Sequence, residues 1–182
     1  MRKVLYILGQ LDDLDVDWIA ETGLKRRLKH GAELIREGES IETMYIVLEG
    51  RLLVDVSSIG IVAELGVGEI VGEISFVDSA PPSASVRTDG NATVLELRRS
   101  AVEARLKDND GFGHRFYKAL AMFLADRLRT TVSRLGYGEA GRMNQAEIME
   151  DEIDDRLLDS VSLAGDQFDR LIKRLQDTPS ID

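Results

Sequence analysis

The feature that most constrains this fold is a run of short β-type segments separated by glycine-bearing turns between Leu24 and Leu97. Each segment is rich in β-branched or aliphatic residues, and glycine allows the chain to reverse between segments. Glu49-Gly50 separates two of the strongest segments and is predicted as a hairpin turn. Several short strands at this spacing favour an all-β sandwich or barrel. A jelly-roll arrangement would leave few strand edges unpaired. The predicted strands are 44–48, 52–56, 61–65, 84–87 and 93–97.

Helical patterns flank the β region on both sides. A short helix is predicted over 12–21, because acidic residues occupy its first turn and Gly23 follows its end. A second helix is predicted over 100–107, and a longer one over about 112–135 carries an apolar stripe spaced by three and four residues. We therefore predict a mainly β fold with flanking helices, built on a double-stranded β-helix (jelly-roll) barrel over about 24–98.

Acidic residues are concentrated near the C-terminus. The formal net charge is -10, and residues 139–182 hold 12 acids and 5 bases, so that segment carries most of it. Six acids and no base lie between 145 and 155, which is typical of a solvated linker. Beyond it, 156–176 has apolar residues at helical spacing. The sequence thus predicts a domain over 1–138, followed by an acidic linker and an amphipathic helical tail over 139–182.

Composition argues against an enzyme and a metal site. The chain has no cysteine, which removes disulfides, zinc–thiolate sites and cysteine nucleophiles. Its two histidines, His30 and His114, lack a third imidazole and are predicted as surface or cap residues. The sequence shows no Ser-His-Asp order, no paired catalytic carboxylates and no Gly-rich Lys-Ser/Thr phosphate loop. We predict no catalytic residues and no bound metal.

The sequence also argues against membrane and nucleic-acid partners. The run from Val4 to Leu8 is too short for a signal-peptide core, and no segment approaches the roughly 18 apolar residues of a membrane span. A sequence pI near 4.8 is a poor electrostatic match for nucleic-acid phosphates. The prediction is a cytoplasmic protein.

The most informative segment is 67–76, where Gly72-Glu73 follows a short predicted strand and precedes one predicted helical turn. Glycine allows close approach of the backbone, and the first N–H groups of a helical turn can hold an anion such as a phosphate. The Glu73 carboxylate can accept a hydrogen bond from a ribose hydroxyl. In another interpretation, Glu73 caps local N–H groups or stays solvated.

The order of these parts resembles the cyclic nucleotide-binding domain family, which includes catabolite activator protein and kinase regulatory subunits. The resemblance spans roughly residues 10–135, and no basic helix-turn-helix follows Gly138, so the chain is similar to a stand-alone member without a DNA-binding domain. It implies a non-enzymatic sensor or regulatory protein that binds cAMP or cGMP and has no other cofactor. The motifs that carry it are Gly31, Leu34-Ile35-Arg36-Glu37-Gly38, Tyr45-Ile46-Val47-Leu48-Glu49-Gly50, Gly66-Val67-Gly68-Glu69, Gly72-Glu73 and Pro82-Ser83-Ala84-Ser85-Val86.

The resemblance also implies roles for individual residues. The Gly-Glu pair would open the phosphate-binding helix, the glutamate would bind the ribose 2′-hydroxyl, and the next two backbone amides would line the phosphate. Small or hydroxyl-bearing residues at 83 and 85 would complete the site, whereas local pattern favours turn or strand roles for both. The long helix would cover the base through a residue near 127–131. The implied ligand-binding residues are Gly72, Glu73, Ile74, Ser75, Pro82, Ser83 and Ser85.

One position departs from the family pattern. The arginine that neutralises the cyclic phosphate falls on Pro82, which has neither charge nor N–H. Loss of such a charged partner costs about 2–5 kcal/mol of binding free energy. Arg87 is a distant substitute, because it shares one face of a predicted strand with Ser83 and Ser85. Two hypotheses follow: a ligand-binding sensor, or a degenerate module that acts in protein interaction and dimerisation with an unknown partner.

The long helix predicts a homodimer. Its apolar stripe continues from Leu124 through Val132 to Leu135, beyond the expected contact with the barrel. The alternative is that the 156–176 tail covers this stripe. The sequence leaves open whether the tail packs on its own domain, on a second subunit or on another protein.

Overall fold

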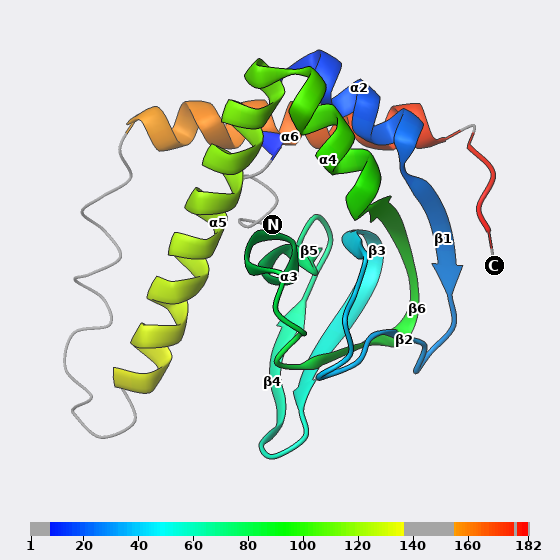
Figure 1. Ribbon diagram of the computed structural model, residues 1–182, viewed down its shortest axis with the longest axis vertical. Coiled ribbons are helices and arrows are strands. Elements are labelled where there is room, and N and C mark those ends of the chain that lie inside the picture. Colours follow the sequence, from blue (N-terminus) through cyan, green and yellow to red (C-terminus); the bar gives the residue numbers. More distant parts are fainter. Residues whose placement is uncertain (1–7, 137–154, 177, 182) are drawn as a thin grey trace.

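The computed structural model describes residues 8–136, 155–176 and 178–181, which form one curled antiparallel sheet with helices at one end and along one side (Figure 1). The predicted mainly β fold with flanking helices is confirmed, whereas the predicted acidic linker, at 139–154, lies outside the described residues. No helix among the described residues is long and apolar enough to cross a membrane. The elements are α2 (Asp13–Thr22), β1 (Leu24–Leu28), β2 (Glu33–Ile35), β3 (Thr43–Val56), β4 (Gly60–Leu65), β5 (Ile70–Val71), α3 (Glu73–Asp78), β6 (Ser85–Arg98), α4 (Arg99–Asp108), α5 (Asp110–Gly136) and α6 (Asp155–Leu175).

Strands β3 and β6 form the centre of the sheet. They pair antiparallel from Thr43 opposite Arg98 to Asp55 opposite Ser85. Strands β1 and β2 pair with β6, and β4 and β5 pair with β3, which gives the main order β1-β6-β3-β4. The sheet is not closed, so the predicted jelly-roll barrel is an open one.

Side chains of the central strands alternate between two hydrophobic cores. Met44 and Ile46 of β3 pack with the helices, whereas Tyr45 and Val47 point into the curl of the sheet. This period of two is what a strand buried on both faces requires. The helical side of the sheet is covered by α2, α4, α5 and α6, and Phe112 of α5 is fully buried there.

The predicted hairpin at Glu49-Gly50 is wrong. The chain continues through these residues as one long strand, β3, with register shifts on either side of Glu49. Gly50 has φ 82°, and a Cβ there would come within 2.5 Å of the Asn91 carbonyl oxygen of β6. The glycine therefore permits a bulge against the neighbouring strand, which a sequence pattern cannot distinguish from a turn.

The helical tail packs on its own domain, which answers the question that the sequence left open. Arg170 of α6 makes a two-pronged contact with Asp17 of α2, at 2.8 and 2.9 Å, and Arg174 reaches the same carboxylate at 2.7 Å. Leu171 and Leu175 are buried in the helical core. In Figure 1, α6 lies across the same end of the sheet as α2.

We expect Asp17→Asn to lower the free energy of unfolding by about 1–2 kcal/mol at pH 7, because both arginines lose a charged acceptor. Hydrogen bonds from Arg170 and then Arg174 hold the pKa of Asp17 well below its usual value. Because the folded pKa is lowered, this stabilisation is present above the unfolded pKa of about 4 and is lost as the pH falls toward the folded value. The free energies of unfolding of the wild type and Asp17→Asn, measured in urea, should therefore converge at acidic pH. The exposed Asp169 of α6 offers the control: an equal loss in Asp169→Asn would contradict the assignment.

Candidate functional site

The candidate site is built on α3 and the loop that follows it, residues 72–85, called the cassette below. Gly72 precedes α3 in the left-handed region, with φ 88°. A Cβ at this position would lie 2.7 Å from the Thr43 carbonyl oxygen and 3.3 Å from the Cα of Met44. Glycine is therefore required both for the backbone conformation and for the close approach of α3 to β3.

Glu73, the first residue of α3, is buried, and its side chain is only 1% exposed. Its carboxylate accepts a hydrogen bond from Nη1 of Arg127 on α5. The Arg127 guanidinium also lies 4.8 Å from the ring centroid of Phe123, one turn earlier on α5. Burial raises the pKa of Glu73, and the positive charge of Arg127 opposes that rise. The pair thus joins the cassette helix to the long helix in a partly desolvated place.

The opposite end of α3 is held by Arg99, the first residue of α4. Its Nη1 donates to the Ser75 carbonyl oxygen at 3.0 Å, and its Nη2 donates to the Ser79 hydroxyl at 2.9 Å. The guanidinium also lies 5.4 Å from the Phe76 ring centroid. Cations are favoured near the last carbonyls of a helix. Arg99 gave no signal in the sequence analysis, because only the fold places the start of α4 beside the end of α3.

The remaining predicted residues of α3 differ in exposure. Ile74 is half exposed, and Ser75 is buried. Ser83 is exposed on the loop that leads into β6.

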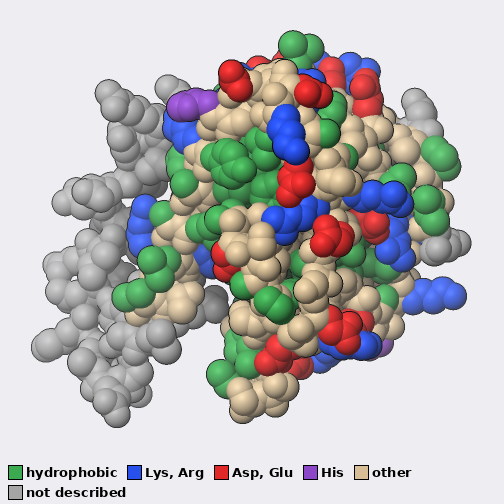
Figure 2. Space-filling view, in the orientation of Figure 1, with side chains coloured by type: hydrophobic (Ala, Val, Ile, Leu, Met, Phe, Trp, Pro, Cys, Tyr) green, Lys and Arg blue, Asp and Glu red, His purple; other side chains and the backbone are tan. Residues whose placement is uncertain are grey.

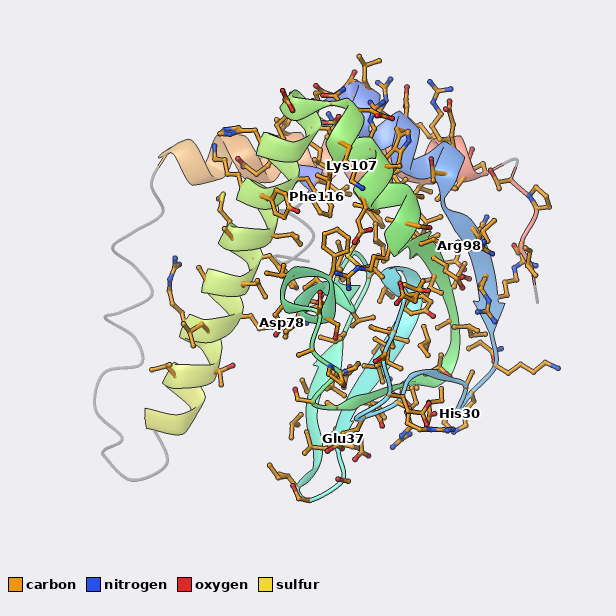
Figure 3. The ribbon with its side chains drawn as sticks, in the orientation of Figure 1. His30, Glu37, Asp78, Arg98, Lys107 and Phe116 are labelled. Carbon is orange, nitrogen blue, oxygen red and sulfur yellow. The ribbon has the colours of Figure 1, made fainter. Side chains whose placement is uncertain are left out.

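Pro82 and Ser85 lie against the turn that follows β2. The Pro82 carbonyl oxygen accepts a hydrogen bond from the Gly38 N–H at 2.8 Å, and the Ser85 hydroxyl accepts one from the Glu37 N–H at 3.0 Å. Within the described part of the chain, no hydrogen bond links Pro82, Ser83 or Ser85 to Glu73. In Figure 3, Asp78 marks the end of α3, and Glu37, whose N–H binds Ser85, lies farther toward the lower end of the sheet.

Two further candidates occupy other positions. Arg87, the suggested substitute for the missing arginine, lies 3.8 Å from the Asp55 carboxylate, with both side chains about one-third exposed. His30 is exposed and accepts a hydrogen bond from the Gly90 N–H at 2.9 Å, and His114 is exposed on α5. Among the described residues, no cluster of three metal-binding side chains is present. The predicted surface positions of both histidines are confirmed.

The surface around the site shows no separation of charge on the face that Figure 2 displays. Acidic and basic side chains are interspersed there, with hydrophobic side chains between them. The face shown therefore carries no broad field of one sign.

Comparison with known proteins agrees with this architecture. Residues 25–109 match the family model described as the cyclic nucleotide-binding domain. A cyclic nucleotide-binding domain from Methylobacillus flagellatus is 23% identical with a TM-score of 0.67, over 78% of this chain and 85% of that one. The regulatory domain of Toxoplasma gondii PKA, crystallised with cAMP, is 26% identical with a TM-score of 0.51, over 57% of this chain and 42% of that one.

Curated sequences also match part of this chain. Lysophospholipase nte1 of Aspergillus fumigatus is 23% identical over 128 residues, which is 68% of this chain. This chain spans between 8% and 16% of the length of the curated relatives it matches. Residues 25–109, which match the family model, contain the cassette and nearly all of the sheet, and this part of the chain belongs to the cyclic nucleotide-binding domain family.

Proposed function

We propose that this chain is a non-enzymatic regulatory module that binds a cyclic nucleotide, cAMP or cGMP, at the cassette. The observation that carries the proposal is the buried Glu73 carboxylate, which lies at the start of α3 and is bonded to Arg127 of α5. A ribose hydroxyl that binds Glu73 would share or replace this contact. The similar Toxoplasma gondii domain was crystallised with cAMP, which supports the ligand class.

Arg127 supplies the positive charge that position 82 lacks. Its guanidinium reaches the N-terminal end of α3 from another helix, so a bound phosphate and the Glu73 carboxylate would compete for the same donor. Ligand binding would then favour one position of α5 over another, because the ligand interacts differently with the two positions. The change in the position of α5 would transmit ligand binding beyond the cassette.

A second candidate function is a degenerate module that binds no nucleotide and acts in protein interaction. Pro82 favours it, because proline offers the phosphate neither a charge nor an N–H. The polar groups at Pro82 and Ser85 are also already engaged with the turn at residues 36–38. The two candidates differ in whether the unaltered chain binds nucleotide.

Titration calorimetry with cAMP and cGMP separates the two candidates. We expect saturable binding by the unaltered chain. Pro82→Arg should bind at least about 30-fold more tightly than the unaltered chain, because a charged partner of phosphate contributes about 2 kcal/mol or more of binding free energy. Pro81→Arg adds the same charge one residue away and is the control. Binding by Pro82→Arg alone would favour the degenerate module, and no binding by any of the proteins would overturn the cassette assignment.

The Glu73–Arg127 pair can be tested without nucleotide. We expect Arg127→Met to lower the free energy of unfolding by about 3 kcal/mol at pH 8, because it leaves a buried carboxylate without its cation. Burial raises the folded pKa of Glu73, so the carboxylate becomes protonated as the pH falls and no longer needs a cation. The loss of unfolding free energy in Arg127→Met should therefore be smaller near pH 4. Urea unfolding at both pH values measures this. Exposed Arg129 provides the control Arg129→Met, and an equal, pH-independent loss in both variants would refute the account.

We also propose that the module dimerises through the outer stripe of α5. Leu128 is 64% exposed and Val132 is 58% exposed, so neither is covered by α6 or by the sheet. Leu124, the first residue of the predicted stripe, packs against the helical core instead, and the side chain of Leu135, the last, lies outside the described residues. Burial of such a stripe in a second helix is a common basis of helix pairing.

Analytical ultracentrifugation tests the dimer. We expect the wild-type chain to sediment as a dimer and Leu128→Glu to sediment as a monomer, because the substitution places a charge in the seam. Leu14 of α2 is 72% exposed, so Leu14→Glu adds the same charge elsewhere. A wild-type monomer, or a dimer that persists in Leu128→Glu, would exclude this interface.

A further inference from the structure

Helix α6 presents a basic and apolar face to the domain. Leu171 and Leu175 are fully buried, with exposed fractions of 0% and 1%. Arg170 and Arg174 flank these leucines at a spacing of one turn and reach α2. The Lys25 ammonium donates to the Leu175 carbonyl oxygen at 3.1 Å and so attaches the C-terminal end of α6 to β1.

The surface under α6 is acidic. Asp13 and Asp17 are four residues apart on α2 and therefore lie on one face of that helix. Arg170 donates to Asp13 at 2.7 Å as well as to Asp17, whose carboxylate also receives Arg174. Two arginines and two aspartates thus match in spacing as well as in charge.

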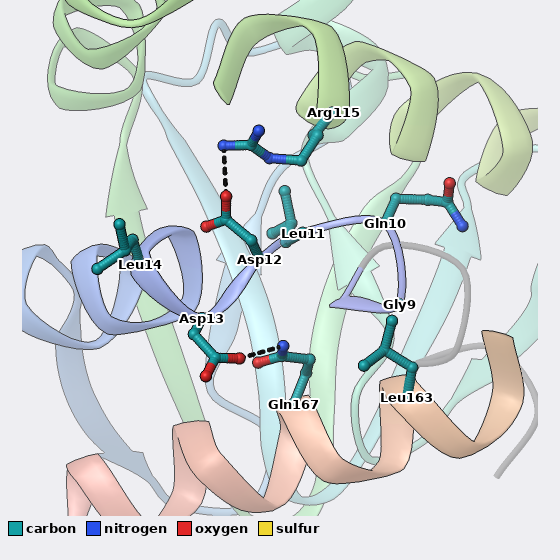
Figure 4. A pocket seen from close by; sticks show the side chains of 9 residues that line it. All are labelled: Gly9, Gln10, Leu11, Asp12, Asp13, Leu14, Arg115, Leu163 and Gln167. Carbon is teal, nitrogen blue, oxygen red and sulfur yellow. Dashed lines mark hydrogen bonds and ion pairs between the residues drawn. The ribbon is translucent and has the colours of Figure 1, made fainter. Parts of the chain in front are cut away.

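The contact between α6 and α2 is less complete around Gln167. Gln167 is buried and donates through Nε2 to Asp13 at 2.8 Å, but its Oε1 has no hydrogen-bond partner in the described part of the chain. Beside it lies a hollow of about 490 Å³ between the start of α2, α5 and α6 (Figure 4). A buried acceptor without a donor is unfavourable. The hollow is lined by Gly9, Gln10, Leu11, Asp12, Asp13, Leu14, Arg115, Leu163 and Gln167.

The arginines that hold α6 are also accessible to solvent. The Arg170 side chain is 35% exposed and that of Arg174 is 52% exposed. Ion pairs with such exposure are weakened by salt and contribute modestly. A helix with a similar basic face, a donor opposite Gln167 and larger side chains for the hollow would make more contacts on α2 than α6 does.

We propose that the acidic face of α2, formed by Asp13 and Asp17, is a docking surface for a basic amphipathic helix of a partner protein. Helix α6 occupies this surface in the structure and is displaced when the partner binds. The charge complementarity of α6 defines the partner chemistry: arginines one turn apart, next to buried leucines. This inference goes beyond nucleotide binding and does not depend on it.

The test uses a fluorescein-labelled peptide with the sequence of residues 163–176 and fluorescence anisotropy against the full chain. In Arg170→Ala/Arg174→Ala, α6 loses its anchors, so we expect the peptide to bind at least tenfold more tightly than to the wild type. Adding Asp17→Asn to that variant should weaken binding about tenfold. A control peptide carrying Arg170→Glu and Arg174→Glu should not bind. Absence of binding to the folded double variant, or equal affinity with and without Asp17→Asn, would overturn the proposal.

Hydrogen exchange of the wild-type chain keeps the proposal testable if the double variant does not fold. The amides of residues 164–175 should exchange faster than those of β3 and β6, and excess peptide should accelerate them further by displacing α6. Exchange of α6 that is as slow as that of the sheet and insensitive to peptide would refute it. A wild-type dimer that Asp17→Asn dissociates and Leu128→Glu leaves intact would assign the surface to a second copy and overturn the partner assignment.

Discussion

The pairing of β3 with β6 is the constraint on which the other contacts depend. The two strands run antiparallel along nearly their whole length. In each strand, consecutive side chains point to opposite faces of the sheet. One face receives the helices and the other lines the curl, so a single pair of strands contributes to both cores. A register slip of one residue would exchange the two faces. The position of the cassette follows from this pairing, since β5 and α3 are placed against β3.

Two arginines from different helices hold the cassette helix at its two ends. Arg127 of α5 meets Glu73 at the start of α3, and Arg99 of α4 meets the carbonyl oxygens at its end. The same α5 carries Arg115, whose Nε donates to Asp15 of α2 at 2.6 Å. Helix α5 is therefore bonded both to the cassette and to the helix on which α6 rests. A movement of α5 would change both contacts, which gives the proposed regulatory module a physical route between ligand and tail.

Particular residues show how far sequence reasoning reached. Gly72 and Glu73 were identified because a glycine before a helical turn and a carboxylate beside it have local chemical meaning. Arg127 was included only in a range expected to reach a base, and its bond to Glu73 depends on how α5 lies over α3. The wrong hairpin at Glu49-Gly50 has a similar cause, since the close approach of β6 to Gly50 is a contact between distant parts of the chain. Local patterns carry no information about such contacts.

The sequence by itself determined the class of fold, the flanking helices and the absence of an arginine at position 82. These follow from side-chain periodicity, from capping residues and from residue identity, which act over a few positions. Only the tertiary structure decided that the sheet stays open, that Glu73 is buried against Arg127 and that α6 returns to α2. Each of these depends on burial and charge pairing between segments far apart in the chain. The free energy of a charge pair is the balance between the attraction of its partners and the cost of removing both from water, and that balance arises only where the fold brings the two segments together.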